Sequence, residues 1–372
     1  MLTETVSGKK MIILLSTFML GSTIILGGST VLGQDSWVSV ITGALWAFPI
    51  VIIYARIVQL YPNKNIYEIC LDLFGNFFGK VIIFLFSWYA LHLGALVLRN
   101  FSEFIQISSK TETPQIIVLL SMMVVIFYLV KSGIKTMGRW SLIVFWVICL
   151  VVIISFIFSH TGADNFDNLL PFLNHTPGEF LIDSFYLFSF PYAEVVLFLT
   201  FFNSLQRGES PYKVFLYALF ITMIILLVVA IRNITLLGPE MLKISFFPSY
   251  VATRLINVGK FLTKIEGIVM INFILLGITK TAVCLLATCK GITHLFDLKD
   301  YKAIAIPISF FMVALAMIVY PNVIEMLEFA ERGYYCVYAS LFQVIIPLLI
   351  WIVAEIKNKK IIELKTTIHK VH

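Results

Sequence analysis

The side chains that could do chemistry in this sequence are the few ionisable ones that stand inside long apolar stretches. Glu194 lies near the middle of the stretch 180–202. If that stretch crosses a bilayer, an isolated charge there costs several kcal/mol, so the carboxyl must face a polar cavity, find a partner or be protonated. Glu194 is therefore a candidate for proton exchange or gating. The alternative is a neutral acid that bonds a carbonyl freed beside Pro191.

Three further titratable residues, His92, Glu266 and Lys280, are candidates for the same roles. His92 is either a proton carrier or a hydrogen-bonded packing residue, and Glu266 stands at the start of its stretch. Lys280 either extends its ammonium to the inner membrane surface or serves as a fixed cation inside the protein. Arg99 and Glu103 are four residues apart, so they are expected to pair on one helix face.

Two short segments predict interrupted helices. Gly21-Ser22-Thr23 stands near the middle of its apolar stretch, and Pro191 removes an amide donor from another. Amides at the first break would bind a carboxylate, and carbonyls at the second would bind an ammonium, although small residues also let helices pack closely. The predicted ligand-binding residues are Gly21, Ser22, Thr23, Tyr89, Ser189, Phe190, Pro191 and Tyr192.

Signatures of enzymes and metal sites are missing from the sequence. It has no His-Glu-x-x-His, no Gly-x-Ser-x-Gly and no phosphate-binding glycine loop with lysine. The 5 cysteines are scattered without metal-ligand spacing. We therefore expect no catalytic residue, no metal and no cofactor. The basic residues stand in short clusters between apolar runs, so nucleic acid is not an expected partner.

The composition indicates what kind of element positions these residues. Of the 372 residues, 60% are hydrophobic, 15% are aromatic and 13% are charged. A soluble domain carries roughly 25% charged residues. The chain is therefore predicted to be an all-α integral membrane protein.

About 20 apolar residues of helix cross a bilayer core, and the sequence contains ten candidate spans. They are 11–32, 37–60, 81–107, 116–130, 140–158, 180–202, 214–237, 265–287, 303–320 and 334–354. Ten spans admit a five-plus-five inverted repeat, in which the first helix of each half is often broken. The breaks predicted in helices 1 and 6 fall at those places.

Lysine and arginine gather in alternate loops, which predicts that both termini are cytoplasmic. The segment between spans 7 and 8 is an exception with several cations, and its residues 246–264 predict an amphipathic helix that lies on the outer surface or caps a cavity. The expected divisions are a cytoplasmic head at 1–10, a ten-helix transmembrane domain at 11–354 and a basic cytoplasmic tail at 355–372. The tail is expected to be structureless and close to anionic lipid.

The sequence contains an ordered series of short motifs. The series is Phe18-Met-Leu-Gly-Ser-Thr-Ile-Ile-Leu26, Gln34-Asp-Ser-Trp37, Leu60-Tyr-Pro-Asn-Lys64, Phe74-Gly75, Leu98-Arg99, Phe101-Ser-Glu-Phe104, Ser189-Phe-Pro-Tyr-Ala-Glu194, Leu237-Gly-Pro-Glu240, Phe247-Pro-Ser-Tyr250 and Lys264-Ile-Glu266. In this order the motifs resemble the spore germination proteins that form the integral-membrane B subunit of germinant receptors, and the resemblance runs from about residue 8 to residue 357.

That family is similar to the amino acid–polyamine–organocation transporters. The resemblance implies a germinant-sensing subunit in the inner membrane of a bacterial spore, which binds a small amino-acid-like germinant in a transporter-type pocket. Its implied partners are an A subunit and a C lipoprotein subunit. Two alternatives stay open: an amino acid–proton secondary transporter that uses the same pocket, and an assembly subunit whose ligand site is vestigial.

Overall fold

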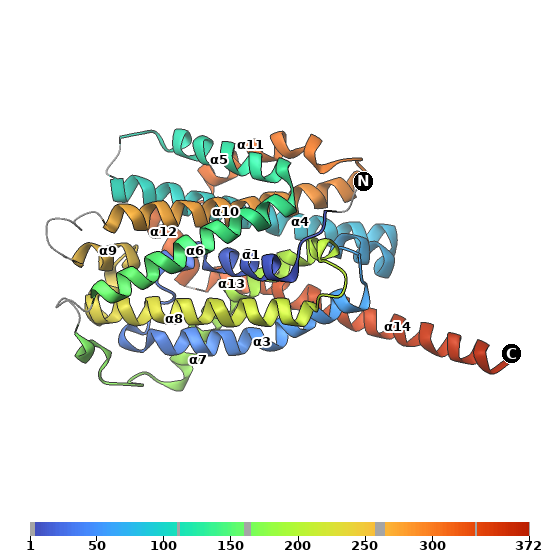
Figure 1. Cartoon of the computed structure of the whole chain (residues 1–372), viewed down its shortest axis with the longest axis horizontal. Coiled ribbons are helices and arrows are strands. Elements are labelled where there is room, and N and C mark those ends of the chain that lie inside the picture. Colours follow the sequence, from blue (N-terminus) through green and yellow to red (C-terminus); the bar gives the residue numbers. More distant parts are fainter. Residues whose placement is uncertain (1–3, 110–111, 160–164, 257–264, 332, 372) are drawn as a thin grey trace.

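A computed structural model describes residues 4–109, 112–159, 165–256, 265–331 and 333–371, and the elements in these ranges are helices (Figure 1). The spans run roughly parallel to the long axis of the molecule. The helices are α1 (Gly8–Leu20), α2 (Thr23–Leu26), α3 (Ser36–Leu60), α4 (Ile66–Ser109), α5 (Gln115–Ser132), α6 (Ile134–Ser159), α7 (Pro177–Ser189), α8 (Pro211–Ile244), α9 (Pro248–Leu255), α10 (Ile265–Leu295), α11 (Ala305–Ile318), α12 (Val323–Glu331), α13 (Tyr334–Ser340) and α14 (Ile346–Val371).

Eight spans in the described part of the chain are long and apolar enough to cross a membrane. The count rises to nine if α11 and the start of α12, which meet at a 97° bend, form one span. The all-helical membrane fold is thus confirmed, but the count of ten is not. The predicted first span is divided into α1 and α2, neither of which is long enough to count alone.

Both predicted interruptions are present. The helix α1 ends at Leu20, and α2 gives way to Gly27 and Gly28, whose φ angles are +76° and +85°. Residues other than glycine rarely adopt positive φ angles of this size. The helix α7 ends at Ser189, and after Pro191 the chain continues as the 3₁₀-helix η3 (Tyr192–Thr200). Backbone groups freed inside a bilayer must be satisfied by protein, so these breaks are places where other side chains converge.

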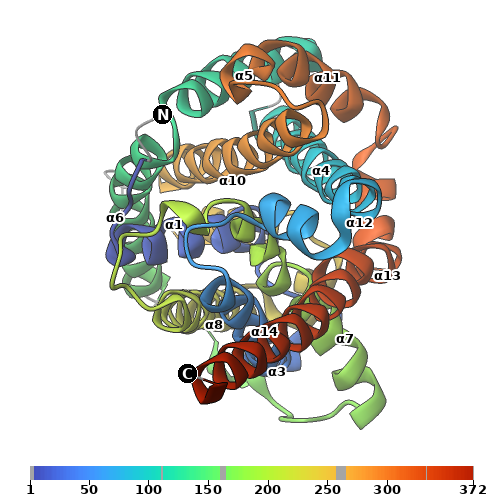
Figure 2. The same ribbon diagram turned by 90° about the vertical axis from the view of Figure 1, so that its right-hand side faces the viewer.

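Viewed end-on, α1 and α10 lie in the interior of the bundle, and other helices surround them (Figure 2). Nearly every residue of α1 is buried. The outer helix α6 differs, because one stripe of it is exposed: Ile143, Trp146, Leu150, Ile153 and Ile157. The spacing of three and four residues places these side chains on one helix face, which is the face that lipid would cover.

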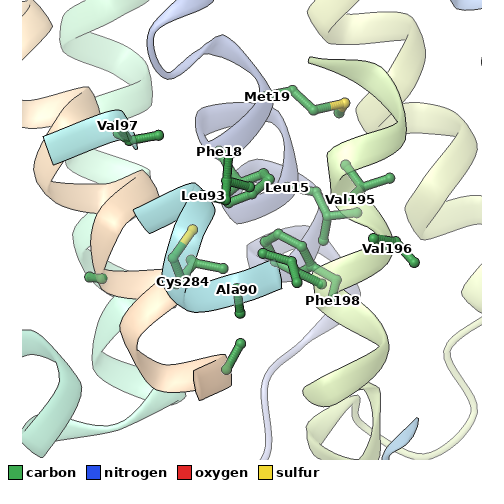
Figure 3. Packing of buried hydrophobic residues seen from close by; sticks show 14 of the residues in the cluster. Leu15, Phe18, Met19, Ala90, Leu93, Val97, Val195, Val196, Phe198 and Cys284 are labelled. Atoms are coloured by element: carbon green, nitrogen blue, oxygen red, sulfur yellow. The ribbon is translucent and has the colours of Figure 1, made fainter. Parts of the chain in front are cut away.

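A cluster of buried apolar side chains joins α1, α4, η3 and α10 (Figure 3). Phe18 of α1 and Phe198 of η3 meet edge to face, with ring centroids 5.3 Å apart. Leu15, Ala90 and Cys284 fill the space around them and are fully buried. Phe18 precedes the first break and Phe198 follows the second. The cluster therefore lies between the two breaks and the end of the bundle that carries the termini, and it fills the interior there.

Both termini lie at the same end of the bundle, on the right of Figure 1. The predicted structureless tail is wrong, because α14 continues to Val371 as helix. The reason is that residues 355–371 contain no glycine or proline to end a helix. The predicted amphipathic helix is α9, which starts at Pro248. Residues 257–264 of that prediction lie outside the described part of the chain.

Candidate functional site

The two helix breaks are joined by a buried ion pair. Lys280 Nζ of α10 lies 2.5 Å from Glu194 Oε2 of η3, and neither side chain has any exposed surface. The Tyr335 hydroxyl donates to the other carboxylate oxygen, Oε1, at 2.6 Å. Charge-assisted hydrogen bonds of this kind are about twice as strong as neutral ones. Glu194 therefore has both of its oxygens bound inside the protein.

The absence of a side chain at Gly21 makes room for Lys280. A Cβ atom at Gly21 would lie 2.4 Å from Lys280 Cδ, closer than any two such atoms approach. The ammonium also lies over the ring of Phe190, 4.6 Å from its centroid, and 5.3 Å from that of Phe18. Lys280 was predicted either to extend to the inner membrane surface or to serve as a fixed cation inside the protein. In the structure its side chain is buried beside the first break, as the second interpretation predicts.

Gln343 holds the second break to α4. Its Nε2 donates to the Ser189 carbonyl at 2.8 Å and to the Tyr89 hydroxyl at 2.9 Å, and its Oε1 accepts from the Ser189 hydroxyl at 2.9 Å. Tyr89 and Tyr335 have their hydroxyl oxygens 3.3 Å apart. The Ser189 carbonyl, which was predicted to bind an ammonium, already has a donor within the protein.

A cavity lies next to this network, on the side away from the termini. It encloses about 960 Å³ of empty space, including open solvent at its mouth. Its wall combines the chain after α2 (Ser29, Thr30), the face of α4 (Leu93, Val97), α7, the start of α9 and α12. The cavity thus lies between the two broken spans, and its lining is mostly apolar.

Among the described residues that line the cavity, Asp183 of α7 is the only carboxylate, and none is a lysine, arginine or histidine. Asp183 is 1% exposed, and the Ser29 hydroxyl donates to its Oδ1 at 2.5 Å. The other oxygen, Oδ2, has no partner with hydrogen-bond geometry in the described chain, although the Ser39 hydroxyl lies beside the same carboxylate.

The predicted ligand-binding residues are only partly brought together. Phe190 lines the cavity and also contacts Lys280, whereas the Tyr192 hydroxyl turns away and donates to the Val40 carbonyl at 3.0 Å. Ser22 and Thr23 are buried at the first break, and their hydroxyl oxygens have no hydrogen-bond partner in the described chain.

The other two candidates for proton exchange lie away from the Glu194 network. His92 stacks on Trp88, with ring centroids 5.8 Å apart, and faces a separate cavity with Glu325 and Glu328. Glu266 lies in the first turn of α10, and its side chain is outside the described part of the structure. Arg99 and Glu103 form the predicted pair, with 2.8 Å between nitrogen and oxygen. The described residues contain no group of three or more His, Cys, Asp or Glu side chains that could hold a metal.

Three residues of the site were missed in the sequence: Asp183, Tyr335 and Gln343. Asp183 and Gln343 each carried a signal, because both are strongly polar residues inside predicted spans, where such residues are functional candidates by default. Tyr335 carried none, since it stands at the beginning of its span, where tyrosines are common.

A family model described as spore germination protein matches residues 5–324. The chain belongs to the spore germination protein family. Among curated proteins, this spore germination protein is 29% identical to spore germination protein KB of Bacillus subtilis (strain 168) over 358 residues, which cover 95% of this chain and 96% of the relative. It is 26% identical to the putative spore germination protein YfkT of the same strain, over 87% of this chain and 88% of that one.

Solved structures of transporters share the fold. Mhp1, a nucleobase-cation-symport-1 family transporter in a closed conformation with bromovinylhydantoin bound, matches with a TM-score of 0.67 at 12% identity and covers 92% of this chain and 79% of its own. MhsT in complex with L-phenylalanine matches with a TM-score of 0.63 at 12% identity, over 94% of this chain and 98% of its own. This spore germination protein is therefore a multi-pass membrane protein with a transporter-like fold.

Proposed function

We propose that this spore germination protein is the ligand-sensing membrane subunit of a germinant receptor. It binds a small amino-acid-like germinant in the cavity between the two broken spans, and binding shifts the population of two conformations. It acts in the inner membrane of the spore, together with an A subunit and a C lipoprotein subunit.

The cavity between the breaks is the observation that carries this proposal. Its empty space of about 960 Å³, which includes open solvent at the mouth, is of the order that a small ligand needs, and a mostly apolar wall with few polar groups is typical of such sites. Membership of the spore germination family supplies the biological context, and the transporter-like fold supports a binding site at this depth.

The buried ion pair next to the cavity favours a sensor over a proton-coupled symporter. The Lys280–Glu194 pair and the apolar cluster around Phe18 and Phe198 are fully buried, so a ligand in the cavity meets a wall on the side of the termini. A proton–solute symporter must bind and release a proton in every cycle. A carboxylate held by both an ammonium and a hydroxyl is poorly suited to that exchange.

The decisive experiment combines uptake with germination. Vesicles that contain this chain alone are tested for gradient-driven uptake of labelled amino acids, and spores that carry wild type, Glu194→Gln or a deletion of the chain are tested for germination. The sensor predicts no sustained uptake, loss of germination on deletion and a shifted germinant dose for Glu194→Gln. Uptake that Glu194→Gln abolishes would instead identify the symporter. Loss of germination on deletion of the chain, with no ligand binding and with normal germination by Glu194→Gln, would identify the assembly subunit.

The orientation is tested separately with cysteine accessibility. Asp167, Glu328 and Lys299 are exposed in the structure. Single cysteines at Asp167 and Glu328 are expected to react with an impermeant reagent from outside, and one at Lys299 only from inside. External labelling at Lys299 would reverse the proposed placement of both termini in the cytoplasm.

A further inference from the structure

Asp183 has no stated role, although it is a buried acid on the wall of the cavity. It lies seven residues before Phe190 on α7, two turns from the second break. No lysine or arginine of the described chain forms an ion pair with it. His175, whose charge acts on Asp183, is hydrogen-bonded to Asp35 at 2.8 Å. A buried carboxylate without a cation is costly, and the ammonium group of a ligand in the cavity would supply the missing cation.

The geometry of Ser29 prepares the carboxylate for such a cation. Its hydroxyl donates to Asp183 Oδ1 at 2.5 Å and accepts from the Val31 amide at 3.2 Å. This contact fixes the orientation of the carboxylate and joins the chain after the first broken span to the helix before the second break. The oxygen left over, Oδ2, has no partner with hydrogen-bond geometry in the described structure.

The rest of the wall restricts what else the ligand can carry. The described residues that line the cavity include no lysine, arginine or histidine, so no side chain offers a cation to an acidic ligand. Leu93, Leu96, Val97, Phe190 and Phe329 instead offer apolar surface. The wall therefore fits a molecule with one ammonium group and an aliphatic or aromatic body. The carboxylate of an α-amino acid would be left to the backbone amides and hydroxyls of the chain after the first broken span, where Ser29 and Thr30 line the same cavity.

We propose that Asp183 is the ammonium-binding residue of this cavity, and that its ligand is an apolar primary amine or an α-amino acid with an apolar side chain. The ligand ammonium donates to Oδ2 of Asp183, while the body packs against α4 and α12. The Ser189 carbonyl is not needed for this contact, because it is bonded to Gln343. The assignment rests on the proposed function, since it names the class of ligand for the same cavity.

The test measures binding to the purified full-length chain by ligand-induced thermal stabilisation. Four probes are used: L-leucine, 3-methylbutylamine, the isosteric alcohol 3-methylbutan-1-ol and the acid 4-methylpentanoate. The two amines are expected to stabilise the wild type, and the alcohol and the acid are not. Asp183→Asn is expected to weaken amine binding roughly ten- to hundredfold, the range for a lost charge-assisted hydrogen bond.

Two controls accompany the variant. Asp167→Asn makes the same change at an exposed loop position and should bind the amines as the wild type does. The comparison of amine with alcohol on the wild type needs no variant, so it decides the question even if Asp183→Asn does not fold. The assignment is overturned if neither amine stabilises the wild type, if the alcohol binds as well as the amine, or if Asp183→Asn binds the amines unchanged.

Germination assays separate this assignment from the proposed function. Loss of amine binding in Asp183→Asn, with normal germination of spores that carry it, would uphold the binding site and contradict the sensor. Defective germination on deletion of the chain, with amine binding indifferent to Asp183, would uphold the sensor and contradict the assignment.

Discussion

Two buried acids on the same broken span have opposite surroundings. Glu194 follows the break and has both carboxylate oxygens bound, one by Lys280 and one by Tyr335. Asp183 precedes the break and has a hydroxyl on one oxygen and no hydrogen-bonded partner on the other within the described chain. Glu194 faces packed protein, whereas Asp183 faces a cavity.

The difference separates a structural charge from a charge that is available for binding. A pair that is complete inside the protein stabilises one arrangement of the helices, and removal of one partner leaves the other buried and uncompensated. A carboxylate that lacks a protein cation gains its partner only when a ligand arrives. Burial alone does not distinguish the two acids, because both are almost fully enclosed.

The largest effect is expected from Lys280→Met, which removes the ammonium and leaves Glu194 buried without its cation. We expect a loss of about 3–5 kcal/mol of stability, measured by unfolding in detergent. The double variant Lys280→Met with Glu194→Gln should recover most of that loss. If the stability losses of the two single substitutions simply added in the double variant, the two side chains would not be coupled. The comparison of the two acids would then have no basis.

Tyr335→Phe should have the next largest effect. It removes one hydrogen bond to the Glu194 carboxylate and keeps the ring, and hydrogen bonds to charged groups are worth about 1.5–3 kcal/mol. Thermal unfolding measures the loss. Tyr338→Phe is the matched control on the same helix, because the Tyr338 hydroxyl lies beside Trp88 and has no partner with hydrogen-bond geometry in the described chain. Equal losses in both variants would show that the contact with Glu194 contributes nothing specific.

A methyl group at Gly21 should disturb the ion pair by a smaller amount. The new Cβ would lie 2.4 Å from Lys280 Cδ and 2.8 Å from the Phe18 carbonyl oxygen, so the lysine must move. Overpacking of this kind costs about 1–3 kcal/mol. Gly267→Ala on α10 is the control, because nothing lies within 4 Å of its added Cβ. If Gly21→Ala left both stability and the germinant response unchanged, the proposed place of the first break in the site would be wrong.

The smallest change in stability is expected for Asp183→Asn in the absence of ligand. The amide oxygen can still accept from Ser29, and the variant removes a buried charge that lacks a cation, so the change should stay within about 1 kcal/mol. Unfolding of the ligand-free protein measures it beside Glu194→Gln, which should be far more destabilising. If Asp183→Asn lost as much stability as Glu194→Gln, Asp183 would be a structural charge like Glu194, and the two acids would not differ in role.

The helical fold and its two interruptions were predictable because their causes are local. Apolar stretches of the length of a bilayer core form helices. Gly21 disfavours the helix that contains it because its backbone is conformationally free, and Pro191 removes an amide donor. The pairing of Arg99 with Glu103 was predictable for the same reason, since four residues bring two side chains to one helix face. The tail was mispredicted because its basic composition hid a sequence that continues the helix of α14.

The partners inside the site were decided by tertiary structure alone. Glu194 is 86 residues from Lys280 and 141 residues from Tyr335 along the chain. Only the crossing of α10 and α13 over the second break brings these groups together. The sequence by itself determined that several charges would be buried and where helices would break, because hydropathy and backbone chemistry act along the chain. Which acid would be paired and which would face a cavity depended on the packing of distant helices, because the cost of burying a charge is set by its neighbours in space.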